Sequence, residues 1–234
     1  MSKVEQSKKL ELERIIFIGR TYEEYMDMFS LSKKDISGKK ILDCPAGACS
    51  FTALANRLGA DVTACDIAYY YTGVDLKNKG LQDIKHAMTS MEKVKENFVW
   101  DYFKNIEELK THRLSALNEC ANDMTEHSER YIPVTLPALP FENEEFDIIL
   151  SAHFLFMYAD RLDYKFHLQT IDELLRISKD EIRIFPLVDL EGKRYKHLDK
   201  IINYLKEKNC TVEERKAAYE FQKNANSLLK ITKR

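Results

Sequence analysis

The sequence lacks long apolar runs, and it lacks a strong excess of either charge. No stretch reaches the roughly 18 apolar residues that a membrane-spanning helix requires, and the charged residues 1–14 contain no apolar signal core. The formal net charge of −2 argues against the broad basic surface of a nucleic-acid-binding protein. We therefore expect a soluble, cytoplasmic protein without a membrane partner, and nucleic acid is disfavoured as a partner.

Glycine and cysteine are both scarce, with seven and five in 234 residues. An odd number of cysteines without a signal peptide predicts reduced thiols. Cys44, Cys49 and Cys65 are expected close together in the fold, but a metal site would need more ligands at C-x-x-C-like spacing. We therefore predict no metal and expect these thiols to be small buried side chains. A redox-sensitive pair is the alternative.

From Lys39 onward, apolar strand patterns alternate with helical patterns. The sequence predicts a helix between the first two strands that ends at Gly59, which makes a right-handed βαβ unit with parallel strands. The predicted fold class is therefore α/β. Strands are expected at residues 39–44, 61–66, 130–135, from 146, 181–188, 210–217 and 227–233.

The predicted domain organisation is an N-terminal helical lid segment, residues 1–35, followed by one α/β domain, residues 36–234. Residues 73–128 are polar, almost free of Gly and Pro, and predict two or three helices, of which about 91–125 are predicted to be a helical insertion. A helix is expected from Thr21, with Tyr22 and Tyr25 on its aromatic face. This helix either packs on the sheet or covers a bound ligand.

The first strand runs into Asp43, and a turn of small residues leads from it into a helix, in the sequence ILDCPAGACSF. Ligands bind at such turns because the helix N-terminus offers free N–H groups and small residues admit the ligand to the backbone. A dinucleotide site would need G-x-G-x-x-G, whereas this turn has only Gly47. The acid and the sparse glycines favour S-adenosyl-L-methionine, a sulfonium cofactor without phosphate.

Asp66 ends the second predicted strand. Nucleotide-binding folds place a ribose-binding acid roughly 20 residues after the first strand, and Asp66 lies at about that distance from Asp43. Its carboxylate could accept hydrogen bonds from both ribose hydroxyls. A helix cap or a solvated acid is the structural alternative.

These motifs together resemble the class I S-adenosylmethionine-dependent methyltransferases. Leu42, Asp43 and Gly47 match the family motif L-D-x-G-x-G-x-G, whereas Pro45 and Cys49 stand at its outer glycines. Asp66 matches the ribose acid, and LPFENEEFDIILS matches the stretch leading into strand four. The resemblance implies a Rossmann-like, mostly parallel seven-stranded sheet with helices on both faces, S-adenosyl-L-methionine as cofactor and methyltransferase activity.

A closer resemblance links the chain to small bacterial proteins assigned as methyltransferases of unknown substrate. It rests on RTYEEYMDMF, LDCPAGACSF, SAHFLFMY, RIFPLVDL and YEFQKNAN. Where the family often has an adenine-binding acid after strand three, this chain offers Thr135. The predicted cofactor-binding residues are Arg20, Tyr25, Asp43, Pro45, Ala46, Gly47, Asp66, Ile67, Thr135, Leu136 and Ser151.

The segment SAHFLFMY follows strand four, where a methyl acceptor would approach the cofactor. His153 is the predicted catalytic base because its ordinary pKa lies near neutrality; pocket lining and structural packing are its alternatives. Phe156 and Tyr158 are predicted to bind substrate, with a core role as the alternative. Gln222, in the loop before the last strand, is predicted to contact substrate.

The leading hypothesis is methyl transfer to a small-molecule acceptor by a monomer or homodimer. A non-catalytic protein that binds S-adenosylmethionine or S-adenosylhomocysteine, as a sensor or partner subunit, is the alternative. A nucleic-acid or protein methyltransferase ranks lower, and the missing glycines count against a nicotinamide oxidoreductase.

Overall fold

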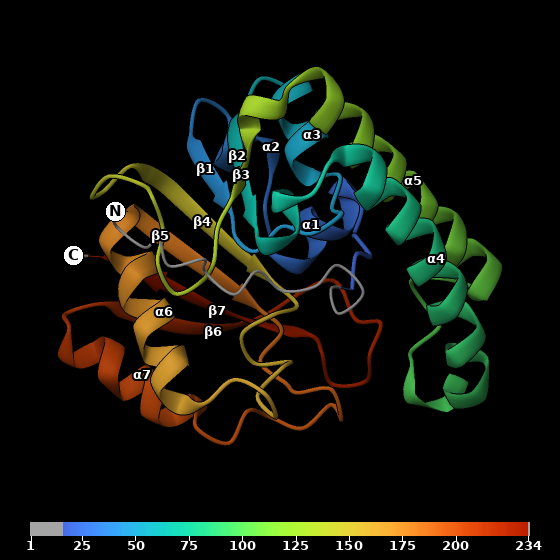
Figure 1. Cartoon of the computed structure of the whole chain (residues 1–234). Coiled ribbons are helices and arrows are strands. Elements are labelled where there is room, and N and C mark those ends of the chain that lie inside the picture. Colours follow the sequence, from blue (N-terminus) through green and yellow to red (C-terminus); the bar gives the residue numbers. More distant parts are fainter. Residues whose placement is uncertain (1–15, 234) are drawn as a thin grey trace, which may run out of the picture.

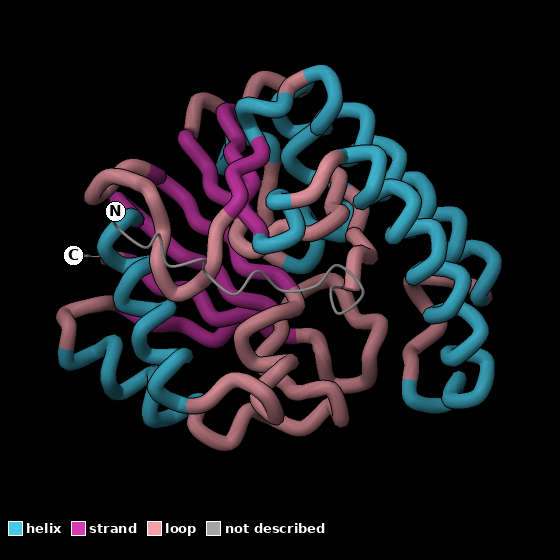
Figure 2. The backbone as a smooth tube through the Cα atoms, in the orientation of Figure 1, coloured by secondary structure: helices cyan, strands magenta, loops and turns pink. Residues whose placement is uncertain are grey.

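The computed structural model describes residues 16–233 and centres on one seven-stranded sheet (Figures 1 and 2). The strands have the order β3-β2-β1-β4-β5-β7-β6. β1 to β5 pair in parallel, whereas β7 runs antiparallel to β5 and β6. The predicted Rossmann-like, mostly parallel sheet is thus confirmed. The strands are β1 Lys40–Asp43, β2 Asp61–Asp66, β3 Tyr131–Pro133, β4 Phe146–Ala152, β5 Ser178–Phe185, β6 Thr211–Lys216 and β7 Ser227–Thr232.

Helices cover both faces of the sheet (Figure 1). Alternate residues of β4 face opposite sides: Ile148 and Leu150 join the core cluster built with α1, α3, α4 and α5, whereas Ile149 joins the one built with α6 and α7. The helices are α1 Tyr22–Met28, α2 Lys33–Ile36, α3 Phe51–Arg57, α4 Gly73–Met91, α5 Ile106–Glu126, α6 Tyr164–Ile177 and α7 Leu198–Glu207, with short 3-10 turns η2 Ile67–Tyr70, η3 Glu92–Asn97 and η4 Ser128–Arg130.

The predicted helical insertion is a pair of packed helices, α4 and α5, joined through η3. We call residues 73–126 the helical arm; it extends beyond the sheet at the right of Figure 1. The helices predicted over residues 73–128 are α4, η3 and α5, and α4 alone spans 19 residues.

The strap, residues 217–226, connects β6 to β7 and is fastened to the arm. The backbone N–H of Val99 donates to the Phe221 carbonyl at 2.7 Å, and that of Lys223 donates to the Asn97 carbonyl at 3.2 Å. The rings of Phe98 and Phe221 stack with centroids 4.8 Å apart. Two segments far apart in sequence are thereby held side by side.

Helix α1 packs its aromatic face inward. A capping box of Thr21 and Glu24 begins the helix. Tyr22 and Tyr25 stack on Phe51 of α3, with centroids 5.8 and 5.0 Å apart. These contacts pack the helix against α3. The first 15 residues of the predicted lid lie outside the described part of the chain.

Among residues 16–233, no helix is both long and apolar enough to cross a membrane.

Candidate functional site

A cleft of about 770 Å³ opens at the carboxyl ends of the central strands. The chain proceeds from β1 outward to β2 and β3 and then returns to β4 on the other side of β1. Ligands of open α/β sheets bind at such a switch point, because the neighbouring connections diverge and leave a crevice. Pro45 and Ala46 follow β1, Asp66 ends β2 and His153 follows β4, and all four line the cleft.

The turn after β1 is locked to the end of β2 by Asp66. Gly47, at a left-handed φ of 56°, donates its N–H to Asp66 Oδ2 at 2.9 Å. Ala68 donates its N–H to Asp66 Oδ1 at 2.8 Å, so the acid also begins η2. Burial raises the pKa of Asp66, and the N–H donors oppose that shift. The side chain still lines the cleft, with 9% of the residue exposed.

Asp43 lies behind this turn. It is fully buried, and its Oδ1 accepts a hydrogen bond from the Tyr25 hydroxyl at 3.0 Å, whereas its Oδ2 has no partner among the described residues. Burial raises the pKa of the Asp43 carboxyl well above its usual range. Burial also raises the pKa of the neighbouring Cys49 thiol to about 12, which leaves it protonated. Asp43 and Tyr25 therefore support the turn from below instead of facing the cleft.

The segment before α1 lies directly on the turn. A Cβ built on Gly19 would come within 1.8 Å of the Ala48 carbonyl oxygen, so only glycine allows this approach. Arg20 donates its backbone N–H to Cys49 Sγ at 3.2 Å and accepts the N–H of Ser50. The close contact places the Arg20 side chain at the cleft wall.

A buried ion pair forms the floor beside Arg20. Glu24 accepts two hydrogen bonds from the Arg113 guanidinium, at 2.6 and 2.9 Å, and one from the Tyr219 hydroxyl at 2.9 Å. Burial acts to raise the pKa of Glu24, but the charge and hydrogen bonds of Arg113 outweigh it and lower that pKa. Within the described residues, the buried Arg20 Nε has no hydrogen-bond partner. One carboxylate, that of Glu24, thus faces two guanidinium groups.

His153 lines the same cleft directly after β4, in a left-handed backbone conformation with φ 51°. Its backbone N–H donates to the Phe185 carbonyl at 2.7 Å, which holds the residue beside the end of β5. Burial first, and then the charges of Arg20 and Arg113, lower the pKa of His153 well below its usual value. The imidazole is therefore neutral near pH 7, and burial and the two guanidinium charges oppose its protonation.

The structure brings together part of the predicted site. Arg20, Pro45, Ala46, Asp66, His153, Tyr158 and Gln222 line the cleft. Phe156 does not: it is 1% exposed and stacks on Tyr195 at 5.0 Å in the core beneath α6, so the core alternative describes it. The remaining predicted residues also lie outside the cleft lining: Tyr25, Asp43 and Ser151 are buried, Gly47, Ile67 and Leu136 are half-buried, and Thr135 is exposed.

Several lining residues were not predicted from the sequence. The arm contributes Met88, Met91, Val94 and Phe98, and the strap contributes Tyr219 and Phe221. The polar, charged sequence of the arm gives no sign that part of it reaches the cleft. Within residues 16–233, no group of three or more His, Cys, Asp or Glu side chains is arranged to hold a metal ion.

The fold and the cleft define a doubly wound α/β protein with a cleft at its switch point. No family model matches the sequence. The chain is 39% identical over 223 residues to Uncharacterized protein MJ0045 of Methanocaldococcus jannaschii, which covers 95% of this chain and 98% of that protein. The chain belongs to the same family as this archaeal protein.

Similar solved structures have low sequence identity. A magnesium protoporphyrin IX methyltransferase from Synechocystis PCC 6803, with bound SAM, has a TM-score of 0.48 and 11% identity, covering 86% of this chain and 73% of that chain. A SAM-dependent methyltransferase from Aquifex aeolicus has a TM-score of 0.45 and 12% identity, covering 89% and 91%. The [4+2]-cyclase SpnF has a TM-score of 0.46 and 11% identity, covering 91% and 79%.

Proposed function

We propose that the protein is an S-adenosylmethionine-dependent methyltransferase acting on a small molecule. The observation that carries the proposal is Asp66, which ends β2 beside the small-residue turn and opens onto the cleft. An acid at this place in a doubly wound fold accepts hydrogen bonds from ribose hydroxyls. A carboxylate has about four lone-pair sites, so the N–H groups of Gly47 and Ala68 leave room for the ribose.

The charges in the cleft fit the amino-acid end of this cofactor. The Arg20 guanidinium lines the cleft with its buried Nε unpaired, and a carboxylate is the group that a guanidinium fork binds best. Pro45 and Ala46 let a ligand lie against the backbone of the turn. When bound, S-adenosylmethionine supplies an electrophilic methyl group on a sulfonium.

His153 is the proposed base. It lies in the cleft beside Arg20, and its neutral ring can take a proton from an acceptor hydroxyl or thiol as the methyl group is transferred. The remaining requirement is alignment of acceptor and cofactor, which the wall of the cleft would provide.

A non-catalytic binding protein is the second candidate. The specific observation in its favour is the low pKa of His153, which makes the imidazole a weak base. Mass-spectrometric detection of S-adenosylhomocysteine formed with trial acceptors separates the two roles, because a sensor binds the cofactor without consuming it.

Thermal unfolding with added cofactor tests the proposal. Saturation at about 100 times Kd should add about 2.7 kcal/mol to the free energy of unfolding, which raises Tm by several degrees. His153→Ala should keep this shift, Asp66→Ala should lose most of it, and NAD should produce none. If neither S-adenosylmethionine nor S-adenosylhomocysteine changes Tm at high micromolar concentration, the cofactor assignment is contradicted. If Asp66→Ala keeps the shift and His153→Ala loses it, the assigned roles are contradicted.

A further inference from the structure

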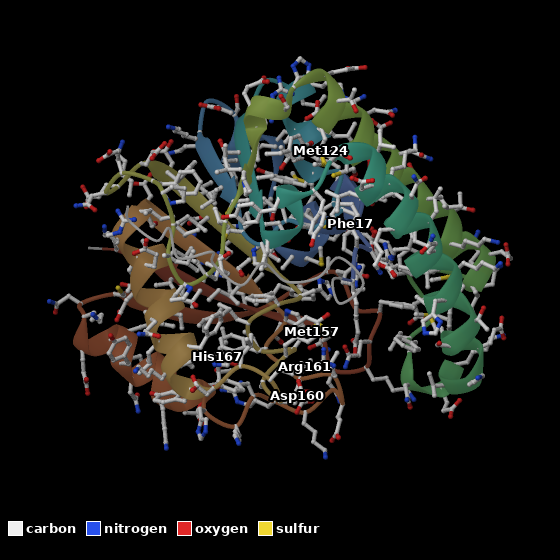
Figure 3. All side chains as sticks on the ribbon, viewed as in Figure 1. Phe17, Met124, Met157, Asp160, Arg161 and His167 are labelled. Carbon is white, nitrogen blue, oxygen red and sulfur yellow. The ribbon has the colours of Figure 1, made fainter. Side chains whose placement is uncertain are left out.

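The outer half of the cleft is walled by apolar side chains from three parts of the chain. The arm contributes two methionines, a valine and a phenylalanine, the loop after β4 contributes a methionine, and the strap contributes a phenylalanine. We call this space the outer chamber; its wall is Met88, Met91, Val94, Phe98, Met157 and Phe221. Figure 3 labels Met157 on the loop after β4, together with Asp160 and Arg161.

Two strap amides near the chamber, those of Gln222 and Asn224, are bonded to the protein. Gln222 Nε2 donates to the carbonyls of Asp189 and Leu190 at 2.9 and 3.1 Å. Asn224 Nδ2 donates to the Gly192 carbonyl at 3.1 Å. These two strap amides hold the loop after β5 against the strap. They are bonded to that loop and are not part of the apolar wall.

None of the six wall residues is charged, although charged side chains line other parts of the cleft: Arg20, Asp66, Arg113, Glu191 and Lys223. Arg20, Asp66 and Arg113 lie at the inner end, around the turn. At the mouth, Glu191 is exposed and pairs with Lys193 at 2.6 Å. Lys223 on the strap is exposed. A charged group placed against the six apolar wall residues would lose water without gaining a polar partner from the wall itself, which is costly.

The chamber is also preformed. The strap is tied to the arm by the backbone hydrogen bonds between residues 97–99 and 221–223, and Phe221 is only 6% exposed. A ligand that enters therefore gains apolar contact without having to order these segments. Three methionines in the wall allow it to adapt to the shape of the ligand.

We infer that the outer chamber binds the methyl acceptor, and that the acceptor is an uncharged, largely apolar small molecule. This inference rests on the proposed function, which assigns the inner, charged end of the cleft to the cofactor. The chamber then selects acceptors by apolar area and shape, and it rejects those that bring a charge into the wall.

The test uses a neutral apolar fluorophore, N-phenyl-1-naphthylamine, titrated into the full chain with and without S-adenosylhomocysteine. We expect saturable binding in both cases. Val94→Glu should weaken it at least about fivefold, because the substitution places a carboxylate in an apolar wall. Leu81→Glu is the matched control: Leu81 is 42% exposed on α4, away from the chamber, and Val94 is 39% exposed, so neither substitution disturbs the core.

A second dye, 1-anilinonaphthalene-8-sulfonate, carries a negative charge on a similar ring system and should bind at least about fivefold more weakly. Equal or tighter binding of the sulfonate, with loss on Arg20→Gln, would show an anionic acceptor and overturn the inference. Three other results would also overturn the inference. They are displacement of the neutral dye by S-adenosylhomocysteine, equal effects of the two Glu substitutions on its binding, and no binding of the neutral dye at all. Failure of S-adenosylhomocysteine to bind, in calorimetry of the same preparation, contradicts the proposed function and not the apolar preference of the chamber.

Discussion

At the scale of single residues, the buried carboxylate of Glu24 connects the side chains that form the floor of the cleft. It is fully buried, and its carboxylate is shared between the guanidinium of Arg113 and the hydroxyl of Tyr219. A buried ion pair is weak support for stability as a whole, but removing one partner leaves an uncompensated charge in a poorly solvated place. The arrangement therefore fixes the position of Arg113 and Tyr219 at the cleft wall.

Glu24→Gln should lower the free energy of unfolding by about 3–5 kcal/mol, because Arg113 then remains buried without a counter-charge. Chemical denaturation at neutral pH measures the change. Glu23→Gln is the matched control, since Glu23 is exposed on the same helix and should alter stability by less than about 0.5 kcal/mol. Equal losses in the two variants would contradict the role of the pair.

His153 should make stability depend on pH. Its folded-state pKa is held well below the usual value, so below about pH 6.5 the unfolded chain binds a proton that the folded chain does not. This group therefore destabilises the fold progressively as pH falls from about 6.5, by up to about 1.4 kcal/mol per pH unit.

His153→Asn should flatten the pH dependence of the free energy of unfolding between about pH 6.5 and 5. Denaturation of both proteins across that range measures the slopes. The same substitution at exposed His86 controls for the loss of an imidazole. A wild-type slope that survives His153→Asn would contradict a buried, neutral imidazole.

At the scale of elements, the contact between strap and arm closes one side of the cleft. Phe221 stacks on Phe98 and meets Trp100 and Phe103 edge-on, with centroids 4.8 to 5.3 Å apart. Few hydrogen bonds connect the strap to the arm, so we expect the strap to stay in place mainly because the Phe221 ring is buried.

Phe221→Ala should release the strap and cost about 3–5 kcal/mol of stability. Hydrogen exchange at the Val99 amide, which donates to the Phe221 carbonyl, should become faster. Lys223→Ala, an exposed change on the same strap, should leave that exchange as it is. Unchanged protection at Val99 in Phe221→Ala would show that the backbone alone holds the strap.

Element types were predictable from the sequence, but some boundaries were not. The strand expected at 181–188 is β5 at Ser178–Phe185. It begins earlier because α6 ends at Ile177 and the chain passes straight into the strand without a turn, and it ends before Pro186, which has no N–H to donate. Alternating apolar residues reveal a strand, but they do not show where a neighbouring helix stops.

At the scale of the whole molecule, the topology was predictable because the alternation of strands and helices restricts the order of a parallel sheet. Much of the predicted cleft follows strand ends, as at Ala46, Asp66 and His153, and the lining positions of Arg20 and Gln222 were predicted as well. The sequence could not show that Phe156 faces α6 and not the cleft, because both positions are apolar. Nor could it show that Glu24 and Arg113 meet, since their contact depends on how the arm packs on α1.

The central claim is that the cleft at the switch point binds the cofactor through Asp66. Calorimetric titration with S-adenosylhomocysteine tests it most directly, using the wild type, Asp66→Asn and, as a control, Asp61→Asn at the exposed start of the same strand. We predict one saturable site that Asp66→Asn weakens at least about tenfold, which corresponds to the loss of charged hydrogen bonds, while Asp61→Asn binds as the wild type does. No heat at high micromolar ligand, or equal affinity in all three proteins, would contradict the claim.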